Sequence, residues 1–202
     1  MSMFRNQKTP TKPDMSFPDA EKAWVKEHYQ DARVILEYGS GGSTVFGGEM
    51  LGSRIFSVES DANWLANLSA WFEENPPLAD VRLHHADIGP TKEWGNPRSD
   101  TAWRKFPDYP IGVWDRDDFE QPDLVLIDGR FRAACFVTAM FRSTKPITVL
   151  FDDYVNRSKY HIVEDYVKPY ETRGRMARFE VHPLSFPVAD LGKIVKLFGV
   201  IQ

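Results

Sequence analysis

The sequence predicts an α/β protein whose doubly wound sheet is mostly parallel and carries an antiparallel strand near the C-terminus. Apolar runs of strand length alternate with segments of helical periodicity along most of the chain, an order that is typical of parallel sheets. The run from Leu124 to Ile127 is apolar without interruption, which is typical of a central strand that is buried on both faces. A chain of 202 residues is long enough for one sizeable core, so we expect a single domain over 1–202.

In the first half of the chain, each of three predicted strands has an acidic residue at or next to its carboxyl end. The helix before the third strand is indicated by Trp64, Leu65 and Leu68, which recur at helical spacing, and Pro76 and Pro77 end it. The elements expected here are, in order, a helix over 18–30, a strand over 33–38, a helix over 44–51, a strand over 54–59, a helix over 61–74 and a strand over 81–87.

The second half continues the alternation and closes with two strands, which we expect to form a hairpin-like pair. The expected elements are, in order, a strand over 123–129, a helix over 132–142, a strand over 147–153, a helix over 160–170, and strands over 178–182 and 193–198. Between the halves, residues 91–121 show no clear periodicity but are rich in aromatic residues. Because long segments of this kind are often functional, the insertion is either an ordered lid or substrate wall, or a packed cover for the sheet edges.

Composition excludes several classes of protein. Lys and Arg number 25 against 29 Asp and Glu, a net charge of −4, which argues against a general nucleic-acid binder. The single cysteine, Cys135, can form no intramolecular disulfide. No apolar stretch has the length of a membrane span, and the polar N-terminus lacks the apolar core of a signal peptide. We therefore expect a cytoplasmic protein with a flexible tail over residues 1–15; the oligomeric state is not indicated.

The most informative segment is the glycine-rich turn that follows the first strand, Glu37-Tyr38-Gly39-Ser40-Gly41-Gly42-Ser43. Glycine permits positive φ and lets the backbone approach a ligand without an intervening Cβ. The free N–H groups at the start of the next helix favour an anionic or polar group. Glu37 can accept hydrogen bonds from ligand hydroxyls or from an ammonium group. The turn therefore predicts a nucleotide-like ligand at this edge of the sheet.

Acidic residues recur at the carboxyl ends of successive strands, where ligands bind in open α/β sheets. An acid can instead cap the helix that follows a strand, but capping explains the whole series poorly. The series consists of Glu37, Glu59, Asp87 and Asp128, followed by the pair Asp152 and Asp153.

With these features the sequence resembles the class I S-adenosylmethionine-dependent methyltransferases, over residues 33–153. The first motif of that family is an acid-x-Gly-x-Gly-x-Gly turn, and here Ser43 stands in place of its third glycine. The resemblance implies a Rossmann-like methyltransferase sheet, S-adenosylmethionine as the cofactor, and methyl transfer. The acceptor expected is a hydroxyl of a small molecule or sugar.

The resemblance also implies a role for each motif position. Glu59 would bind both ribose hydroxyls, Asp87 would reach the adenine amine with Ile88 packed on the ring, and Asp128 would lie beside the transferable methyl group. The full set of implied cofactor contacts is Glu37, Tyr38, Gly39, Ser40, Gly41, Gly42, Ser43, Glu59, Ser60, Asp87, Ile88, Asp128 and Gly129.

A narrower likeness concerns a metal. Asp128-Gly129 and the pair Asp152-Asp153 are similar to the ligands of cation-dependent O-methyltransferases of the catechol and macrolide-sugar types. This likeness implies Mg²⁺ held by Asp128, Asp152 and Asp153, where it would lower the pKa of an acceptor hydroxyl. Adjacent strand residues point to opposite faces, so the site needs a turn at Asp152 or Asp153. The alternative is that Asp153 caps a helix and Asp152 fixes a loop.

Two arginines, Arg130 and Arg132, follow Asp128-Gly129 where a more acidic or histidine-containing segment would be expected. They either receive an anionic substrate or pair with the neighbouring acids. Without a metal, Asp128 or Asp153 is the expected catalytic base or orienting group.

Two alternatives of other classes remain. Glu59 lies 20 residues after Gly39, which also fits the ribose-binding acid of an NAD(P)-dependent oxidoreductase. Against this reading, Thr44 stands where the third glycine of Gly-x-Gly-x-x-Gly is needed, and the chain has no Tyr-x-x-x-Lys pair. The second alternative is a non-catalytic module that keeps the fold and the cofactor.

Overall fold

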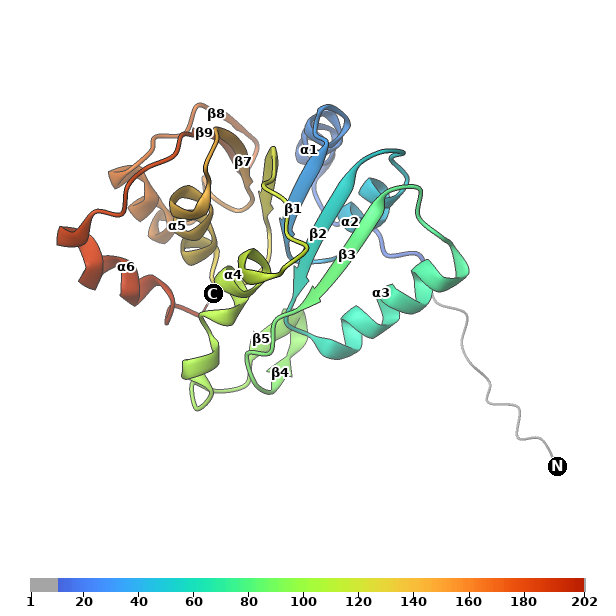
Figure 1. Cartoon of the computed structure of the whole chain (residues 1–202), viewed down its shortest axis with the longest axis horizontal. Coiled ribbons are helices and arrows are strands. Elements are labelled where there is room, and N and C mark those ends of the chain that lie inside the picture. The colour runs from blue at the N-terminus through green and yellow to red at the C-terminus, as the bar shows by residue number, and fades with distance from the viewer. Residues whose placement is uncertain (1–10, 202) are drawn as a thin grey trace.

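The computed structural model describes residues 11–201, and within them seven strands form one sheet in the order β3-β2-β1-β6-β7-β9-β8 (Figure 1). The first five strands in this order are parallel to one another, whereas β9 runs antiparallel to both β7 and β8. The doubly wound, mostly parallel sheet predicted from the sequence is therefore confirmed. The strand order reverses between β1 and β6, which is the place where such sheets bind ligands.

The elements follow the predicted alternation closely. The strands are β1 Val34–Tyr38, β2 Arg54–Glu59, β3 Asp80–His85, β4 Thr91–Lys92, β5 Asn96–Pro97, β6 Leu124–Ile127, β7 Ile147–Phe151, β8 Glu171–Arg173 and β9 Met176–Val181. The α-helices are α1 Asp19–Asp31, α2 Gly42–Gly48, α3 Ala62–Glu74, α4 Asp108–Ile111, α5 Arg132–Arg142 and α6 Leu191–Leu197. The 3₁₀-helices are η1 Glu93–Gly95, η2 Trp103–Lys105, η3 Gly112–Asp115, η4 Ser158–Asp165 and η5 Val188–Asp190.

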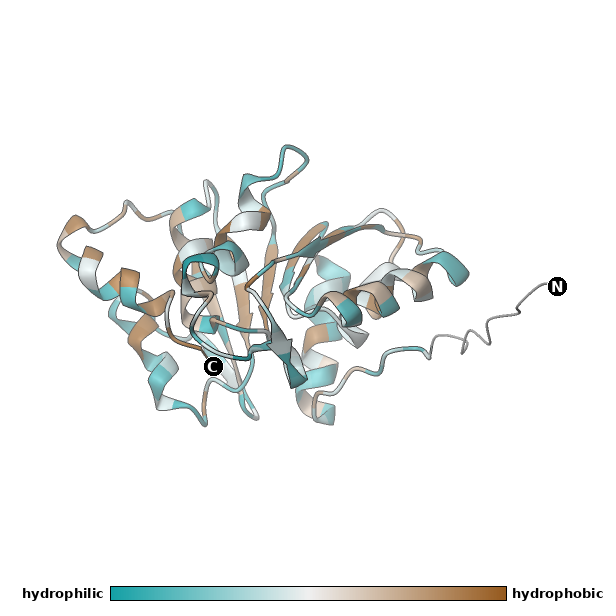
Figure 2. Cartoon of the chain, turned by 90° about the horizontal axis from the view of Figure 1, so that it is seen from below, coloured by the Kyte–Doolittle hydropathy of each residue, from teal (hydrophilic) through white to brown (hydrophobic). Residues whose placement is uncertain are grey.

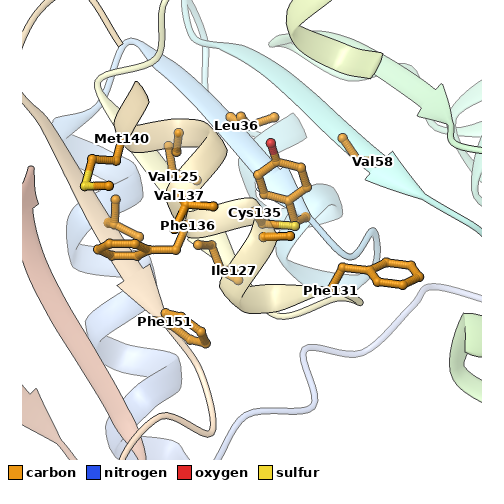
Figure 3. Packing of buried hydrophobic residues seen from close by; sticks show 14 of the residues in the cluster. Leu36, Val58, Val125, Ile127, Phe131, Cys135, Phe136, Val137, Met140 and Phe151 are labelled. Carbon is orange, nitrogen blue, oxygen red and sulfur yellow. The ribbon is translucent and has the colours of Figure 1, made fainter. Parts of the chain in front are cut away.

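Both faces of the sheet are covered by helices. On one face, Trp24, Val25 and Tyr29 of α1 pack against Ile35 and Ile55 of the central strands. On the other face, α5 presents an apolar surface to β1, β6 and β7, and Figure 3 shows Phe136, Val137 and Met140 against these strands. Figure 2 shows hydrophobic residues along the strands between the two helical layers. Burial of apolar surface on both faces explains why β1 and β6 have no exposed residue.

Alternation along β1 sends neighbouring side chains to opposite layers. Val34, Leu36 and Tyr38 belong to the core beneath α5, whereas Ile35 belongs to the core beneath α1. Glu37 consequently points toward α1 and α2, and the hydroxyl of Tyr29 in α1 donates to it over 3.0 Å. The first two motif residues therefore face different layers, Glu37 that of α1 and Tyr38 that of α5.

Two predicted elements near the C-terminus are wrong. Residues 193–198 were expected to be a strand but lie mostly in α6, because Ile194 and Leu197 are buried at helical spacing while Val195 between them is exposed. The antiparallel partner of β9 is instead β8. The helix expected over 160–170 is the shorter 3₁₀-helix η4, which ends at Asp165.

The aromatic insertion 91–121 is ordered into the β4–β5 hairpin and four short helices. Phe106, Tyr109 and Trp114 are buried against the α5 side of the sheet, whereas Trp94 is 80% exposed. Part of the segment therefore packs against the sheet and part is exposed, and its role as a lid or substrate wall stays a prediction. Among residues 11–201, no helix has the length and apolar character needed to cross a membrane.

Candidate active site

A cavity of about 520 Å³ opens at the carboxyl ends of β1, β2 and β6, next to the point where the strand order reverses. A space of this size suits a small organic ligand. Its wall is formed by Asp14, Met15, Ser16, Phe17, Gly39, Ser40, Gly41, Gly42, Ser43, Glu59, Asp61, Trp64, Glu93, Trp94, Gly95, Tyr109, Asp128, Gly129 and Arg130.

The glycine-rich turn forms one side of the cavity, and its glycines have separate roles. Gly39 has a φ of +102°, and a Cβ there would lie 2.9 Å from the Cα and N atoms of Gly129. A Cβ on Gly129 would in turn collide with the hydroxyl of Tyr109. Gly41 is different, because a Cβ there would meet no atom within 4 Å. Gly39 and Gly129 permit the turns after β1 and β6 to touch, whereas Gly41 leaves the cavity open to a ligand.

Glu37 lies beneath this turn, is fully buried and does not reach the cavity. Its carboxylate accepts hydrogen bonds from Tyr29, Ser43, Thr44 and Ser57, of which the bond from Ser57 measures 2.7 Å. Burial raises the pKa of Glu37, while these four hydroxyls oppose the rise. The expectation that Glu37 accepts hydrogen bonds from the ligand lacks support here, because its oxygens are occupied in shaping the turn.

Tyr38 is also buried rather than exposed to a ligand. Its hydroxyl donates to the carbonyl of Pro110 over 2.7 Å and accepts from the indole N–H of Trp114 over 2.8 Å. The side chain thus anchors the aromatic insertion to the sheet, and its assignment as a cofactor contact lacks support from this geometry.

Glu59 ends β2 with one carboxylate oxygen free toward the cavity. Its Oε1 accepts the backbone N–H groups of Ser60 over 2.7 Å and Asp61 over 2.8 Å. Its Oε2 accepts no hydrogen bond from any residue in 11–201, although only 9% of Glu59 is exposed. Burial raises the pKa of Glu59, and the two backbone N–H groups counter the rise. The free oxygen is suited to a ligand hydroxyl.

Three predicted contacts near Glu59 do not line the cavity. The hydroxyl of Ser60 donates to the carbonyl of Gly95 over 2.9 Å and so holds the β4–β5 hairpin in place. Asp87 forms an ion pair with Lys105, which lowers the pKa of its carboxyl, and Ile88 is fully buried in the core. The cavity wall contains the hairpin residues Glu93 to Gly95 and neither Asp87 nor Ile88.

The cavity wall includes residues that the sequence patterns did not single out as contacts. Trp64 donates its indole N–H to the carbonyl of Ser40 over 2.8 Å, fixing the turn from the α3 side. Trp94 has a φ of +62°, a strained conformation for an aromatic residue, and its ring is exposed beside the cavity. Spacing gave no sign of these contacts, because they come from separate elements.

The N-terminal segment supplies another unpredicted part of the wall. Asp14 and Met15 pack over Gly42 so closely that a Cβ on Gly42 would overlap their backbone. Met15 and Phe17 are buried. Of the tail predicted over 1–15, residues 1–10 lie outside the described residues, and the last two residues belong to the cavity.

Asp128 is one of several acidic side chains in the site. It follows β6, lines the cavity and accepts a hydrogen bond from Arg132 over 3.1 Å. Burial raises the pKa of Asp128 to about 8; the charge of Arg132 opposes this rise, and the carboxylates of Asp152 and Asp153 add to it. A carboxyl group with a pKa near neutrality can accept a proton from a substrate and hold it.

Arg132 occupies the centre of the group of acids proposed to bind a metal. Its guanidinium donates to the backbone carbonyls of Asp128, Gly129 and Asp152 over 2.7, 3.0 and 2.6 Å. It also lies 3.4 Å from a carboxylate oxygen of Asp153. Only 4% of Arg132 is exposed, so this buried cation ties together the ends of β6 and β7.

Asp152 and Asp153 are each held by arginines as well. Arg175 binds both oxygens of Asp152, over 2.9 and 2.8 Å, and Arg157 lies 2.7 Å from Asp153. Asp153 has a φ of +58°, so the turn required for both acids to face one cluster is present. Within residues 11–201, no group of three or more His, Cys, Asp or Glu side chains is arranged to hold a metal ion. The acids predicted to bind Mg²⁺ come together, but around guanidinium groups.

No protein-family model matches the chain, and no curated protein matches it. Among solved structures, a methyltransferase-like protein from Silicibacter pomeroyi is 43% identical, with a TM-score of 0.90, and the match covers 93% of this chain and 98% of that one. The chain belongs to the class I S-adenosylmethionine-dependent methyltransferases.

Two further structures share the fold of this methyltransferase at low identity. The O-methyltransferase TomG from Streptomyces achromogenes, in complex with SAM, is 13% identical with a TM-score of 0.53, and the match covers 85% of this chain and 83% of TomG. An O-methyltransferase from Bacillus cereus, in complex with SAH, is 15% identical with a TM-score of 0.56 and 84% of each chain covered. At these identities, the methyltransferase shares with them the sheet and its helical layers.

Proposed function

We propose that this methyltransferase transfers the methyl group of S-adenosylmethionine to a hydroxyl of a small molecule or sugar. The observation that carries the proposal is Asp128, a carboxyl group with a raised pKa in the wall of a cavity bordered by the glycine-rich turn. When bound, S-adenosylmethionine supplies a methyl sulfonium group that is open to in-line displacement by an oxygen nucleophile.

The residues of the cavity fit this cofactor. The open space above Gly41 can receive its amino-acid part, since no protein atom lies within 4 Å of a Cβ built there. The free Oε2 of Glu59 would accept a ribose hydroxyl. The exposed ring of Trp94, beside Glu59 and Gly95, would provide a flat surface for the adenine.

Asp128 would act on the acceptor. It accepts the proton of the acceptor hydroxyl as the oxygen attacks, and Arg132 fixes the orientation of its carboxylate. The remaining rate enhancement comes from holding the two reacting groups in line within the cavity. Asp153, the other expected base, does not line the cavity and is held by Arg157.

Calorimetric titration with S-adenosylhomocysteine and, separately, with NADH tests the proposal. We expect micromolar binding of the first and no binding of the second. Tight binding of NADH would favour the oxidoreductase alternative. Binding of S-adenosylhomocysteine without turnover on any hydroxyl acceptor in a broad screen would favour the non-catalytic alternative.

The Glu59→Gln variant should bind S-adenosylhomocysteine more weakly by about 1.5–3 kcal/mol, or roughly 10- to 150-fold in Kd. Glutamine keeps an oxygen for the N–H groups of Ser60 and Asp61 but replaces the free oxygen with a donor. Calorimetry measures the change, and an unaltered melting temperature serves as the control. An unchanged Kd would show that Glu59 does not bind the ribose.

Turnover should be unaffected by EDTA and should show no stimulation by Mg²⁺. The reason is that Arg132, Arg157 and Arg175 already neutralise the acids that a divalent cation would need. Initial rates with EDTA and with added Mg²⁺ provide the measurement. Stimulation by Mg²⁺ that disappears in Asp152→Asn would contradict this prediction and restore the metal hypothesis.

A further inference from the structure

Guanidinium groups surround the cluster of acids beside the cavity, although the whole chain has a net charge of −4. Arg132, Arg157 and Arg175 form ion pairs with the carboxylates of Asp128, Asp152 and Asp153. A fourth arginine, Arg130, lies in the same cavity wall as Asp128.

Arg130 has no carboxylate partner among residues 11–201, although it stands in the cavity wall. Its Nη1 donates to the side-chain oxygen of Asn96 over 3.1 Å, and its backbone N–H donates to the hydroxyl of Tyr109 over 3.2 Å. Its Nε is buried and has no hydrogen-bond partner among the described residues. Its Nη2 forms no hydrogen bond with any described residue, and the side chain is partly exposed in the cavity wall. This guanidinium can therefore donate to an acceptor that comes from outside the protein.

Arg132 cannot donate to an external acceptor in this way, because backbone carbonyls and carboxylates already occupy its donors. The two arginines that follow Asp128-Gly129 therefore divide the two expected roles. Arg132 pairs with the neighbouring acids, and Arg130 is left facing the cavity that contains Asp128.

We propose that the acceptor carries an oxyanion, either a carboxylate or a phosphate, which Arg130 binds. This inference rests on the proposed function and narrows its substrate class to hydroxylated acids or phosphorylated hydroxyl compounds. The guanidinium would orient the acceptor through paired hydrogen bonds and leave its hydroxyl near Asp128.

The test is calorimetric titration of the protein, saturated with S-adenosylhomocysteine, with sodium phosphate and with sodium benzoate. Sodium chloride at equal ionic strength is the reference. We expect at least one oxyanion to bind, with affinity at least tenfold weaker in Arg130→Gln, which removes the charge but keeps an amide donor. Arg104→Gln is the matched control, because Arg104 lies outside the cavity wall, and this variant should bind like the wild type. The tighter probe identifies the class of oxyanion.

Equal affinity in Arg130→Gln, or no binding beyond chloride, would overturn the proposal. Binding of phosphate that is lost when S-adenosylhomocysteine is added would also overturn it, because Arg130 would then hold the carboxylate of the cofactor. If S-adenosylhomocysteine itself fails to bind, the proposed function fails, and titration of the free protein still shows whether Arg130 binds an anion. Should Arg130→Gln not fold, protection of Arg130 from phenylglyoxal by phosphate, followed by mass spectrometry, supports the site, and lack of protection overturns it.

Discussion

Asp128→Asn is expected to lower kcat by about 10²- to 10⁴-fold, the range associated with loss of a general base. Asparagine preserves the size of the side chain and can still accept a hydrogen bond from Arg132, but it cannot take up a proton. S-adenosylhomocysteine should therefore bind with little change in Kd. Steady-state kinetics with an acceptor found by screening, together with calorimetry, separates these two effects.

The pH dependence gives Asp128 a second signature. In the wild type the base is ionised only above its pKa of about 8, so the rate should rise with pH through that value. Because the folded protein holds this proton more tightly than the unfolded chain, the contribution of Asp128 to stability falls as pH rises from about 4 to about 8. Thermal unfolding across this range should thus show a decline that Asp128→Asn reduces, a measurement that needs no acceptor.

Asp153→Asn is the matched control for this role. Asp153 belongs to the same cluster but is paired with Arg157 and lies outside the cavity wall, so its substitution should reduce kcat far less. A larger loss in Asp153→Asn than in Asp128→Asn would transfer the role of base to Asp153.

Gly39→Ala should destabilise the fold by roughly 2–5 kcal/mol, combining strain at positive φ with overpacking. The added Cβ would lie 2.9 Å from backbone atoms of Gly129, which cannot turn aside as a flexible side chain could. For a domain of this size, the melting temperature should fall by roughly 4–20 °C. Binding of S-adenosylhomocysteine should also weaken, because the turn forms part of the cavity wall.

Gly41→Ala, in the same turn, separates the effect on stability from the effect on ligand binding. A Cβ on Gly41 meets no protein atom within 4 Å, and its φ of 175° is ordinary extended backbone. We expect an unchanged melting temperature and weaker binding of S-adenosylhomocysteine, since the methyl group enters the cavity.

If Gly39→Ala melts like the wild type, the contact between the turns after β1 and β6 is not needed for stability.

Local pattern predicted most of the fold because apolar periodicity reports burial directly. Strand β2 and helix α5 coincide with their predicted ranges, 54–59 and 132–142. The failure at 193–198 has the same origin, since Ile194 and Val195 suggested a strand by their composition while the burial of Ile194 and Leu197 follows a helical period. In that short segment, packing against α5 overrode β propensity.

The candidate site was predicted only in part, because an acid at the end of a strand can face either a ligand or the protein. Glu59 and Asp128 line the cavity, whereas Glu37 faces hydroxyls beneath the turn and Asp87 faces Lys105. Alternation within β1 could have signalled the difference, since Glu37 shares its face with Ile35 and that face is covered by α1.

Consecutive residues predicted the order of strands and helices over most of the chain, the glycine-rich turn and the edge of the sheet where the acids collect. These features follow from hydrophobic periodicity and backbone freedom. The positions of Arg132 and Arg175 among the acids expected to bind a metal, and of Arg130 without a carboxylate partner among residues 11–201, became visible in the folded chain. Charge pairing depends on distances between side chains from different elements, which the spacing of residues along the chain does not encode.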